Sequence, residues 1–370
     1  TAGAFTQISA PTSFDQVASG SWGMFSVRYN TTDGDLELSS LVTPYDLSAA
    51  TYDSVSLSLA FTGMTGTSFN NDGTKLFAVS RAGSQVYEYS LSTAYDIATA
   101  TYVRAFAFNL QQTNGRGLLF NPDGTKMYIS GSSSSTVSQY TLTTGFDLST
   151  ASYANKQLSI SSQDSWAAGM AFNSDGTVLF VVGTTNDRVN KYTLSTAYDV
   201  STGSFSSDYD AQAKDSQTTD IAFTPDGTTM FLSGYTNDKV YKYSLTGAFD
   251  ISSPTFISDF AVGSEETQPM SVMFNSDGSK MYVTGEQNNK VFQYTSQSVL
   301  KPSGYNAAHT TTSTDSTYWT DINSMTADQA AGDGDIYYCV STDDRTTWKI
   351  AKSTDGERSI VRNNSGTWQY

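Results

Sequence analysis

Short runs of apolar residues alternate with polar residues along most of the chain, and glycine, aspartate and asparagine separate the runs. Gly169–Phe172 and Val178–Gly183 have the character of two strands, and Asn173–Gly176 lies between them. The Asp-Gly pair in that segment tolerates the positive φ that a tight hairpin requires. A third strand is expected at Arg188–Leu194 and a fourth from about Ser204, because alternation with a period of two residues is typical of strands.

An Asp-Gly turn of this kind follows a phenylalanine five times along the chain. The aspartates are Asp72, Asp123, Asp175, Asp226 and Asp277, so the units are spaced by 51 or 52 residues. A period of this length is typical of stacked or radially arranged units. Four antiparallel strands in each unit, with no helix between units, indicate the blade of a β-propeller.

The repeat therefore predicts an all-β fold, a β-propeller of seven four-stranded blades that occupies residues 1–370 as a single domain. The expected blades are blade 1 at about 14–60, five Asp-Gly blades at about 61–300 and a divergent last blade at about 305–370. A ring without free edges needs an N-terminal strand, Phe5–Ser9 or Phe14–Val17, to complete a blade near the C-terminus. The alternative is six blades followed by a small C-terminal β-module from about residue 301.

Composition narrows the possible partners and chemistries. The chain has 20 Lys and Arg against 36 Asp and Glu, a formal charge of −16, which argues against nucleic acid as a partner. Cys339 is the only cysteine and His309 the only histidine, so the sequence excludes an intrachain disulfide, a Cys/His zinc site and a His-based triad. Its longest apolar runs are strand-sized, so no membrane insertion is expected.

The ends of the chain bear on its context. The sequence opens on Thr1 and stops at Tyr370 without a terminating change in composition, which suggests a processed product or an excerpt of a longer polypeptide, such as a larger fibre or appendage.

The segment Met281–Gly285, preceded by Asp277–Lys280, resembles the repeat of the YVTN and NHL-like β-propeller families, with Gly285 at the place of the motif's asparagine. The resemblance extends over about two-thirds of the chain. It implies a propeller, and functions that are mostly surface attachment and protein or polymer binding, with some lyases and lactonases. The C-terminal segments Thr347–Lys352 and Ser359–Trp368 resemble parts of structural proteins of marine phages.

Two sets of recurring residues are interpreted as structural. The Asp-Gly aspartates are expected to bond their own turns instead of binding calcium, because they occur once per blade and cannot converge on one ion. An aromatic residue followed by aspartate also recurs, and it predicts an aromatic ring between blades and an aspartate that caps a loop. A tyrosine stripe on the third strand is expected in the core; it comprises Tyr89, Tyr140, Tyr192, Tyr243 and Tyr294.

The candidate binding residues lie where the repeat varies. In a propeller, the crossings between blades and the turns between second and third strands share one face, and such loops commonly bind ligands. The crossings predict a ligand-binding channel mouth formed by Gln112, Asn114, Arg116, Asp164, Trp166, Asp215, Gln217, Glu266 and Gln268. Carboxylates, amides and an exposed aromatic ring suit the hydroxyls and C–H faces of sugars. The alternative is a solvated acidic rim with Trp166 plugging the channel.

The leading functional interpretation is a non-enzymatic structural or adhesion module, extracellular or on a cell or virion surface, that binds a glycan or protein through this variable face. It requires no cofactor. The alternative is a propeller lyase or lactonase that depends on a divalent ion such as Ca²⁺, for which Asp164, Asp215 and Glu266 are the candidate ligands and Asp220 could add another. No catalytic residue is singled out by the sequence.

Overall fold

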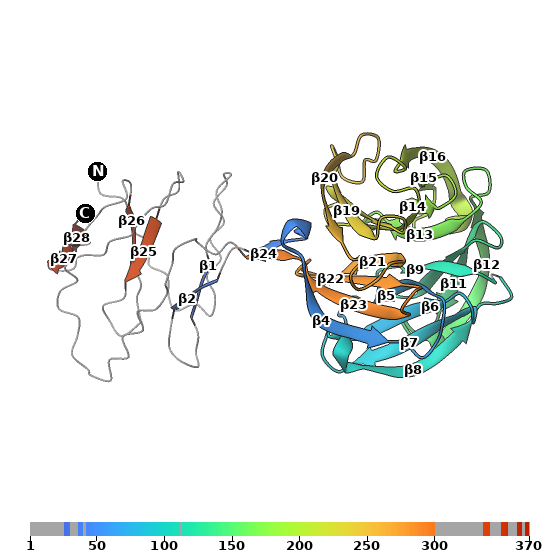
Figure 1. The fold of residues 1–370 in the computed structure, drawn as a ribbon, viewed down its shortest axis with the longest axis horizontal. Helices are drawn as coiled ribbons and strands as arrows, with labels where there is room; N and C mark the ends of the chain where they lie inside the picture. Colours follow the sequence, from blue (N-terminus) through green and yellow to red (C-terminus); the bar gives the residue numbers. More distant parts are fainter. Residues whose placement is uncertain are drawn as a thin grey trace. The chain divides into compact units, whose positions relative to one another are not determined.

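The structure is a computed structural model that describes residues 42–111 and 113–299, together with the short strands 26–29, 36–39, 336–340, 349–353, 361–364 and 367–369. By its internal contacts the chain forms two compact units, residues 43–298 and residues 1–42 with 299–370 (Figure 1). In the described part of the chain, no helix is long and apolar enough to cross a membrane.

The unit of residues 43–298 contains five antiparallel sheets of four strands each. The first sheet consists of β5 (Met64–Phe69), β6 (Lys75–Ser80), β7 (Gln85–Leu91) and β8 (Ala100–Ala107). The second consists of β9 (Gly115–Phe120), β10 (Lys126–Gly131), β11 (Thr136–Leu142) and β12 (Ala151–Ser159). The third consists of β13 (Ala167–Phe172), β14 (Val178–Gly183), β15 (Arg188–Leu194) and β16 (Gly203–Asp210).

The remaining two sheets complete the set. The fourth consists of β17 (Thr218–Phe223), β18 (Thr229–Gly234), β19 (Lys239–Ser244) and β20 (Thr255–Ala261). The fifth consists of β21 (Pro269–Phe274), β22 (Lys280–Gly285), β23 (Lys290–Thr295) and, as its outer strand, β4 (Thr51–Ser58). Outside the blades, β3 (Val42–Pro44) pairs with β24 (Gln297–Val299).

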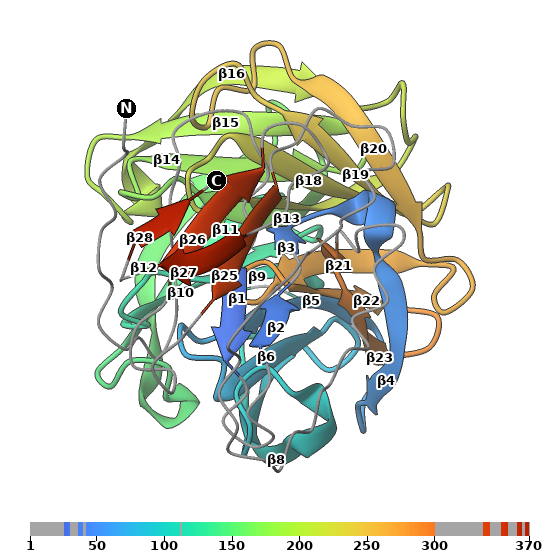
Figure 2. The ribbon, with the colours of Figure 1, turned by 90° about the vertical axis from the view of Figure 1, so that its left-hand side faces the viewer.

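The five sheets form a closed ring of blades. Each inner strand contacts the inner strand of the next blade, and β21 contacts β5 to complete the circle. Figure 2 shows the outer strands β4, β8, β12, β16 and β20 at the periphery of the ring. In the other unit, β1 (Ser26–Tyr29) pairs with β2 (Leu36–Ser39), β25 (Ile336–Val340) with β26 (Lys349–Ser353), and β27 (Val361–Asn364) with β28 (Thr367–Gln369).

The predicted all-β propeller of four-stranded blades is confirmed, and the described residues form five of them. Thr51–Ser58, expected in a first blade at 14–60, instead completes the fifth blade, because it pairs with β23. The strands expected to close the ring, Phe5–Ser9 and Phe14–Val17, lie outside the described residues. The extension of the propeller into 14–42 and 305–370 stays a prediction.

The Asp-Gly turns have the structural role expected of them. In the first blade, Asp72 Oδ1 accepts hydrogen bonds from the amide and the hydroxyl of Thr74, at 3.0 and 2.6 Å. These bonds hold the pKa of Asp72 below its usual value. Gly73 follows with φ +70°, and the ring of Tyr95 covers it so closely that a Cβ there would lie 2.3 Å from Tyr95 Cδ2. The turn therefore requires glycine.

The recurring aromatic-Asp pair joins the blades, as the sequence predicts. Phe146 contacts Phe120 in its own blade and Phe77 in the preceding one, with ring centroids 5.3 and 6.3 Å apart. The aspartate that follows it, Asp147, caps a short 3₁₀ turn by accepting the amide hydrogen of Ser149. In the described part of the chain, four of these pairs precede a 3₁₀ turn: η1 (Leu47–Ala49), η2 (Ile97–Thr99), η3 (Leu148–Thr150) and η4 (Val200–Thr202).

The core lies between the sheets and is rich in aromatic rings. The five tyrosines of the predicted stripe on the third strands are at most 5% exposed, which confirms that they belong to the core. Tyr140, for example, packs between Phe106 and Tyr153 at centroid distances of 5.5 and 5.6 Å. Because each sheet buries both faces against its neighbours, removal of one blade would expose two apolar surfaces.

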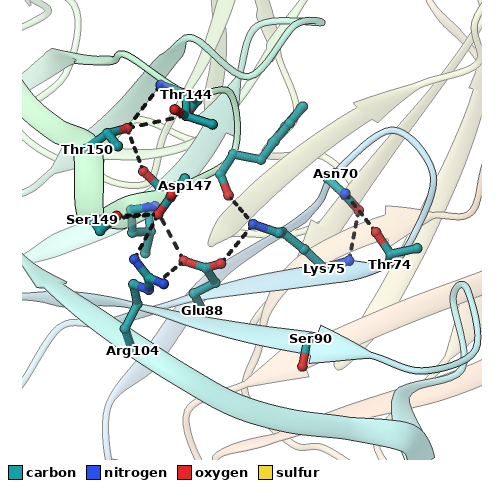
Figure 3. Close-up of polar contacts among 12 residues, drawn as sticks. Asn70, Thr74, Lys75, Glu88, Ser90, Arg104, Thr144, Asp147, Ser149 and Thr150 are labelled. Atoms are coloured by element: carbon teal, nitrogen blue, oxygen red, sulfur yellow. Dashed lines mark hydrogen bonds and ion pairs between the residues drawn. The ribbon is translucent and has the colours of Figure 1, made fainter.

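A buried carboxylate links the first blade to the second. Glu88 on β7 is 2% exposed and accepts bonds from Lys75 Nζ at 2.9 Å and from the amide of Leu148 at 3.3 Å (Figure 3). Arg104 lies between Glu88 and Asp147, with its Nε 3.6 Å from Glu88 Oε2 and its Nη1 2.8 Å from Asp147 Oδ1. Glu88 thereby satisfies donors from two strands of its own blade and from η3 of the next.

We expect Glu88→Ala to destabilise the propeller by about 3–5 kcal/mol, because Lys75 and Arg104 would lose their buried partner. Glu88→Gln should cost less, since Gln139 occupies the equivalent position on β11 and accepts the amide hydrogen of Val200 at 3.1 Å. Urea unfolding of the wild type and both variants measures the difference. Equal losses for both variants would contradict the assigned role of the side-chain oxygens.

Candidate functional site

The predicted carboxylates of the channel mouth are buried and hold two loops together. Asp164, 2% exposed, lies in the crossing between β12 and β13. Its Oδ1 accepts the amide hydrogens of Trp166 at 2.7 Å and Thr185 at 3.3 Å, and its Oδ2 accepts that of Asn186 at 2.8 Å. The crossing is thus fastened to the turn between β14 and β15, which confirms that both loops lie on one face of the ring.

Asp215 and Glu266 repeat this arrangement in the next two blades. Asp215 accepts the amide hydrogens of Gln217, Thr236 and Asn237 at 2.9, 3.1 and 3.0 Å. Glu266, fully buried, accepts those of Gln268 at 2.9 Å and Asn288 at 3.1 Å, and burial raises its pKa. The carboxylates therefore face the backbone of their own loops instead of forming an open rim.

This arrangement bears on the predicted metal ligands. Within the described residues, no group of three or more His, Cys, Asp or Glu side chains could hold a metal ion. Asp164, Asp215 and Glu266 each accept amide hydrogens in a different crossing, and their assignment as ligands of a divalent ion stays a prediction.

The other predicted mouth residues differ in their surroundings. Gln217 and Gln268 are half-buried and follow their clamping carboxylates by two residues, and Asn114 is half-buried at the equivalent place before β9. Gln112 lies outside the described residues. The two that remain, Arg116 and Trp166, lie together: the Arg116 guanidinium carbon is 4.6 Å from the centroid of the Trp166 ring.

Below the mouth, the inner strands approach one another so closely that they leave little room for side chains. Three blades carry glycine at the same position of the inner strand, Gly66, Gly117 and Gly169, and the other two carry Asp220 and Ser271. A Cβ on Gly66 would lie 2.4 Å from the carbonyl oxygen of Arg116, and one on Gly117 would lie 2.5 Å from that of Ala168. We call this layer of five residues, in which the inner strands approach one another, the constriction.

Asp220 is the one carboxylate of the constriction. It is 9% exposed, its Oδ2 accepts the amide hydrogen of Val272 in the next blade at 3.0 Å, and it has further hydrogen bonds with the amide of Met170 in the preceding blade and with the Ser271 hydroxyl. Its side chain fills the space that Gly169 leaves, where a Cβ would lie 1.8 Å from Asp220 Oδ1. Burial raises the pKa of Asp220 to about 7, although these hydrogen bonds lower it.

Arg116 lies at the mouth within reach of all four other blades. It packs on Trp166 of the third blade and interacts electrostatically with Arg81 of the first, Tyr235 of the fourth and Glu286 of the fifth. The side chain is only 9% exposed, and its Nε has no hydrogen-bond partner among the described residues. Desolvation and the neighbouring Arg81 lower the pKa of Arg116, and the opposing effects of Glu286 and Tyr235 only partly offset them.

Further residues border the mouth, beside those predicted from the sequence. The first residue after the second strand borders the mouth in each blade: Arg81, Ser132, Thr184, Tyr235 and Glu286. Arg81 forms an ion pair with Glu286, yet its Nε and the hydroxyl of Thr184 are buried without a partner in the described structure. The repeat alignment contains the necessary signal, because these five differ in chemistry while the residue before them is glycine in four of the five blades.

The mouth can therefore offer a desolvated cation, an aromatic surface and unpaired donors to a ligand. An arginine in a low-dielectric site interacts strongly with a carboxylate or with an oxyanion that develops during a reaction. Trp166, 40% exposed, adds an apolar surface beside that cation.

Comparison with protein families finds one match. The model of a family described as "Lactonase, 7-bladed beta-propeller" matches residues 169–301, about a third of the chain. These residues include the third and fourth blades and β21 to β23 of the fifth. No curated protein matches the chain.

Solved structures similar to this chain include two bacterial proteins. One is a putative 6-phosphogluconolactonase from Bacteroides uniformis, with 15% identity, a TM-score of 0.41, and 72% of each chain covered. The other is a functionally unknown protein from Desulfotomaculum acetoxidans, with 10% identity, a TM-score of 0.40, and 64% of this chain and 83% of that chain covered.

The family match corrects the leading functional interpretation. The sequence favoured a non-enzymatic structural or adhesion module, but the matched model describes lactonases. That interpretation is therefore wrong, and the enzyme alternative agrees better with the finding. The same match supports a β-propeller family, which is the part of the predicted resemblance that the comparison reaches.

The clamp at Asp164 has a measurable consequence. We expect Asp164→Ala to raise the hydrogen-exchange rates of the Thr185 and Asn186 amides and to destabilise the protein by about 2–5 kcal/mol, because several bonds to a charged acceptor are lost. The matched control is Asp175→Ala, which removes an exposed turn aspartate from the same blade. Unchanged exchange at both amides in Asp164→Ala would show that the carboxylate does not hold the turn.

The raised pKa of Asp220 predicts a pH dependence of stability. The folded protein binds the Asp220 proton up to about pH 7, whereas the unfolded chain releases it near pH 3.8, the ordinary pKa of an aspartate. Stability from this group is therefore fully present below about pH 4 and is lost as the pH rises to about 7, by up to about 4 kcal/mol.

Asp220→Asn should remove this part of the pH dependence. The free energy of unfolding, measured in urea at pH 4.5 and pH 8, should differ less between the two pH values in this variant than in the wild type. Asp226→Asn is the control, because hydrogen bonds lower the pKa of Asp226 and it titrates below this window. An identical pH difference in wild type and Asp220→Asn would contradict the assignment.

Proposed function

We propose that this chain is a lactonase-type hydrolase that acts at the mouth of the central channel. The observation that carries the proposal is Arg116, a desolvated cation at the mouth whose Nε lacks a partner among the described residues. The match of the lactonase family model to residues 169–301 supports the reaction class.

The reaction consumes one water for each lactone. The water oxygen bonds to the ring carbonyl carbon, negative charge develops on the carbonyl oxygen, and the ring C–O bond then breaks. The ring oxygen keeps the bonding electrons and takes a proton, so the product is a hydroxy acid that ionises at neutral pH. Arg116 stabilises the developing oxyanion, because a fixed cation in a dry site costs little reorganisation when the charge appears.

Several expectations from the sequence stay predictions beside this proposal. The YVTN/NHL-like assignment, the phage-like tail, the extracellular, cell-surface or virion location, and a glycan or protein partner stay predictions. A requirement for Ca²⁺ also stays a prediction, and assays with and without a chelator address it.

Proton release in a pH-stat tests the activity. We expect the full chain to hydrolyse members of a panel of γ- and δ-lactones, and Arg116→Thr to lower kcat/KM by about 10²–10³-fold, as loss of an oxyanion donor does. Threonine is chosen because Thr65 and Thr219 occupy the equivalent position in two other blades.

Arg188→Ala provides the control, because Arg188 forms ion pairs with Asp208 and Asp210 on the third blade and takes no part in the mouth. Its activity should equal that of the wild type. Hydrolysis of every lactone at the buffer rate, or full activity in Arg116→Thr, would overturn the proposal.

A further inference from the structure

Two departures from the repeat meet at the mouth. Arg116 stands at a position of the inner strand that holds Thr65, Ala168, Thr219 and Met270 in the other blades. Trp166 stands in the adjacent blade at a different position, one that holds Gly63, Asn114, Gln217 and Gln268 elsewhere. Neither residue is required by the blade, yet the two are in cation–π contact at 4.6 Å.

The fold fixes Trp166 more firmly than it fixes Arg116. The Trp166 amide donates to Asp164 Oδ1 at 2.7 Å, and its carbonyl oxygen accepts the amide hydrogen of Thr184 at 3.2 Å. The Arg116 guanidinium has no hydrogen bond or ion pair with any described residue, so the indole ring is the contact that orients it.

The charged groups around Arg116 favour a ligand with a single negative charge. Glu286 is paired with Arg81 and also interacts electrostatically with Arg116, so that one carboxylate serves two guanidinium groups. Arg81, Arg116 and Glu286 together carry one formal positive charge, while the carboxylates Asp164, Asp215 and Glu266 of the crossings accept backbone amide hydrogens. The formal net charge of the whole chain is −16. A monoanion is balanced at such a site, whereas a dianion would leave negative charge in a desolvated place and would be repelled by the rest of the protein.

We propose that Arg116 and Trp166 form a receptor for a single carboxylate, with Trp166 as the residue that positions the guanidinium. A carboxylate is planar and can accept two parallel N–H bonds from a guanidinium, while the indole packs on the guanidinium plane. The inference rests on the proposed function only in that lactone hydrolysis produces such a group; the receptor itself needs no catalysis.

Binding to the full chain tests the receptor directly. The probes are 4-hydroxybutyrate and glycolate as carboxylates, inorganic phosphate as the competing oxyanion, and chloride at matched ionic strength. Calorimetry measures affinity, and tryptophan fluorescence reports on Trp166 when the signal of Trp166→Gln is subtracted. Glutamine is chosen because Gln217 and Gln268 occupy that position in the next two blades.

We expect carboxylates to bind more tightly than phosphate, and Arg116→Thr to weaken carboxylate binding by about 10- to 100-fold. Trp166→Gln should weaken it by about 2- to 30-fold, and Trp166→Phe should restore most of the loss because the π face remains. Arg188→Ala should bind like the wild type.

Each contrary outcome has a separate meaning. Carboxylate affinity unchanged in Arg116→Thr, or tighter binding of phosphate, overturns the receptor. Equal weakening in Trp166→Phe and Trp166→Gln overturns the positioning role of the ring. If carboxylates bind but no lactone is turned over, the receptor is supported and the proposed hydrolase is overturned. If turnover depends on Arg116 but no carboxylate binds, the hydrolase is supported and the receptor is overturned.

Discussion

The pairing of β4 with β23 is the constraint on which the other features of the propeller depend. It joins residues about 240 positions apart, and Asp53 secures it by accepting bonds from the Thr295 amide at 2.9 Å and the Gln293 side chain at 2.8 Å. Tyr45, just before β4, covers Gly278 as the other blades' own aromatic residues cover their turn glycines. Because the ring is closed, the five inner strands contact one another and the residues of the mouth have fixed positions.

Because the inner strands lie so close together, most residues of the mouth stabilise the fold, and only a few are available to a ligand. Backbone atoms approach so closely in the constriction that three blades tolerate only glycine. The carboxylates of the crossings accept hydrogen bonds from backbone amides of the adjacent turns. Arg116 and Trp166 differ from these residues, because the Nε of Arg116 has no hydrogen-bond partner among the described residues and Trp166 is 40% exposed. A site whose polar groups are left unpaired by the fold is the expected place for a ligand.

The repeat made the blades predictable, because local turn chemistry and period-two alternation determine each one. Asp72, Tyr140 and Phe146 have the roles that their recurrence indicates. The closing strand was not predictable, since Thr51–Ser58 pairs with a partner remote in sequence and carries no mark of it. The acidic rim was misjudged for a related reason: the amide donors that bury Asp164 belong to a turn about 20 residues later. Sequence identified Arg116 and Trp166 as candidates, but only the structure brings them into contact.

The central claim is that Arg116, held by Trp166, meets the carboxylate or oxyanion of a small molecule at the mouth of the ring. A crystal structure of the full chain soaked with 4-hydroxybutyrate tests it most directly. We expect the carboxylate within hydrogen-bond distance of the Arg116 guanidinium, with the indole still stacked on that group. A carboxylate bound elsewhere, with Arg116 turned away to pair with Glu286, would contradict the account.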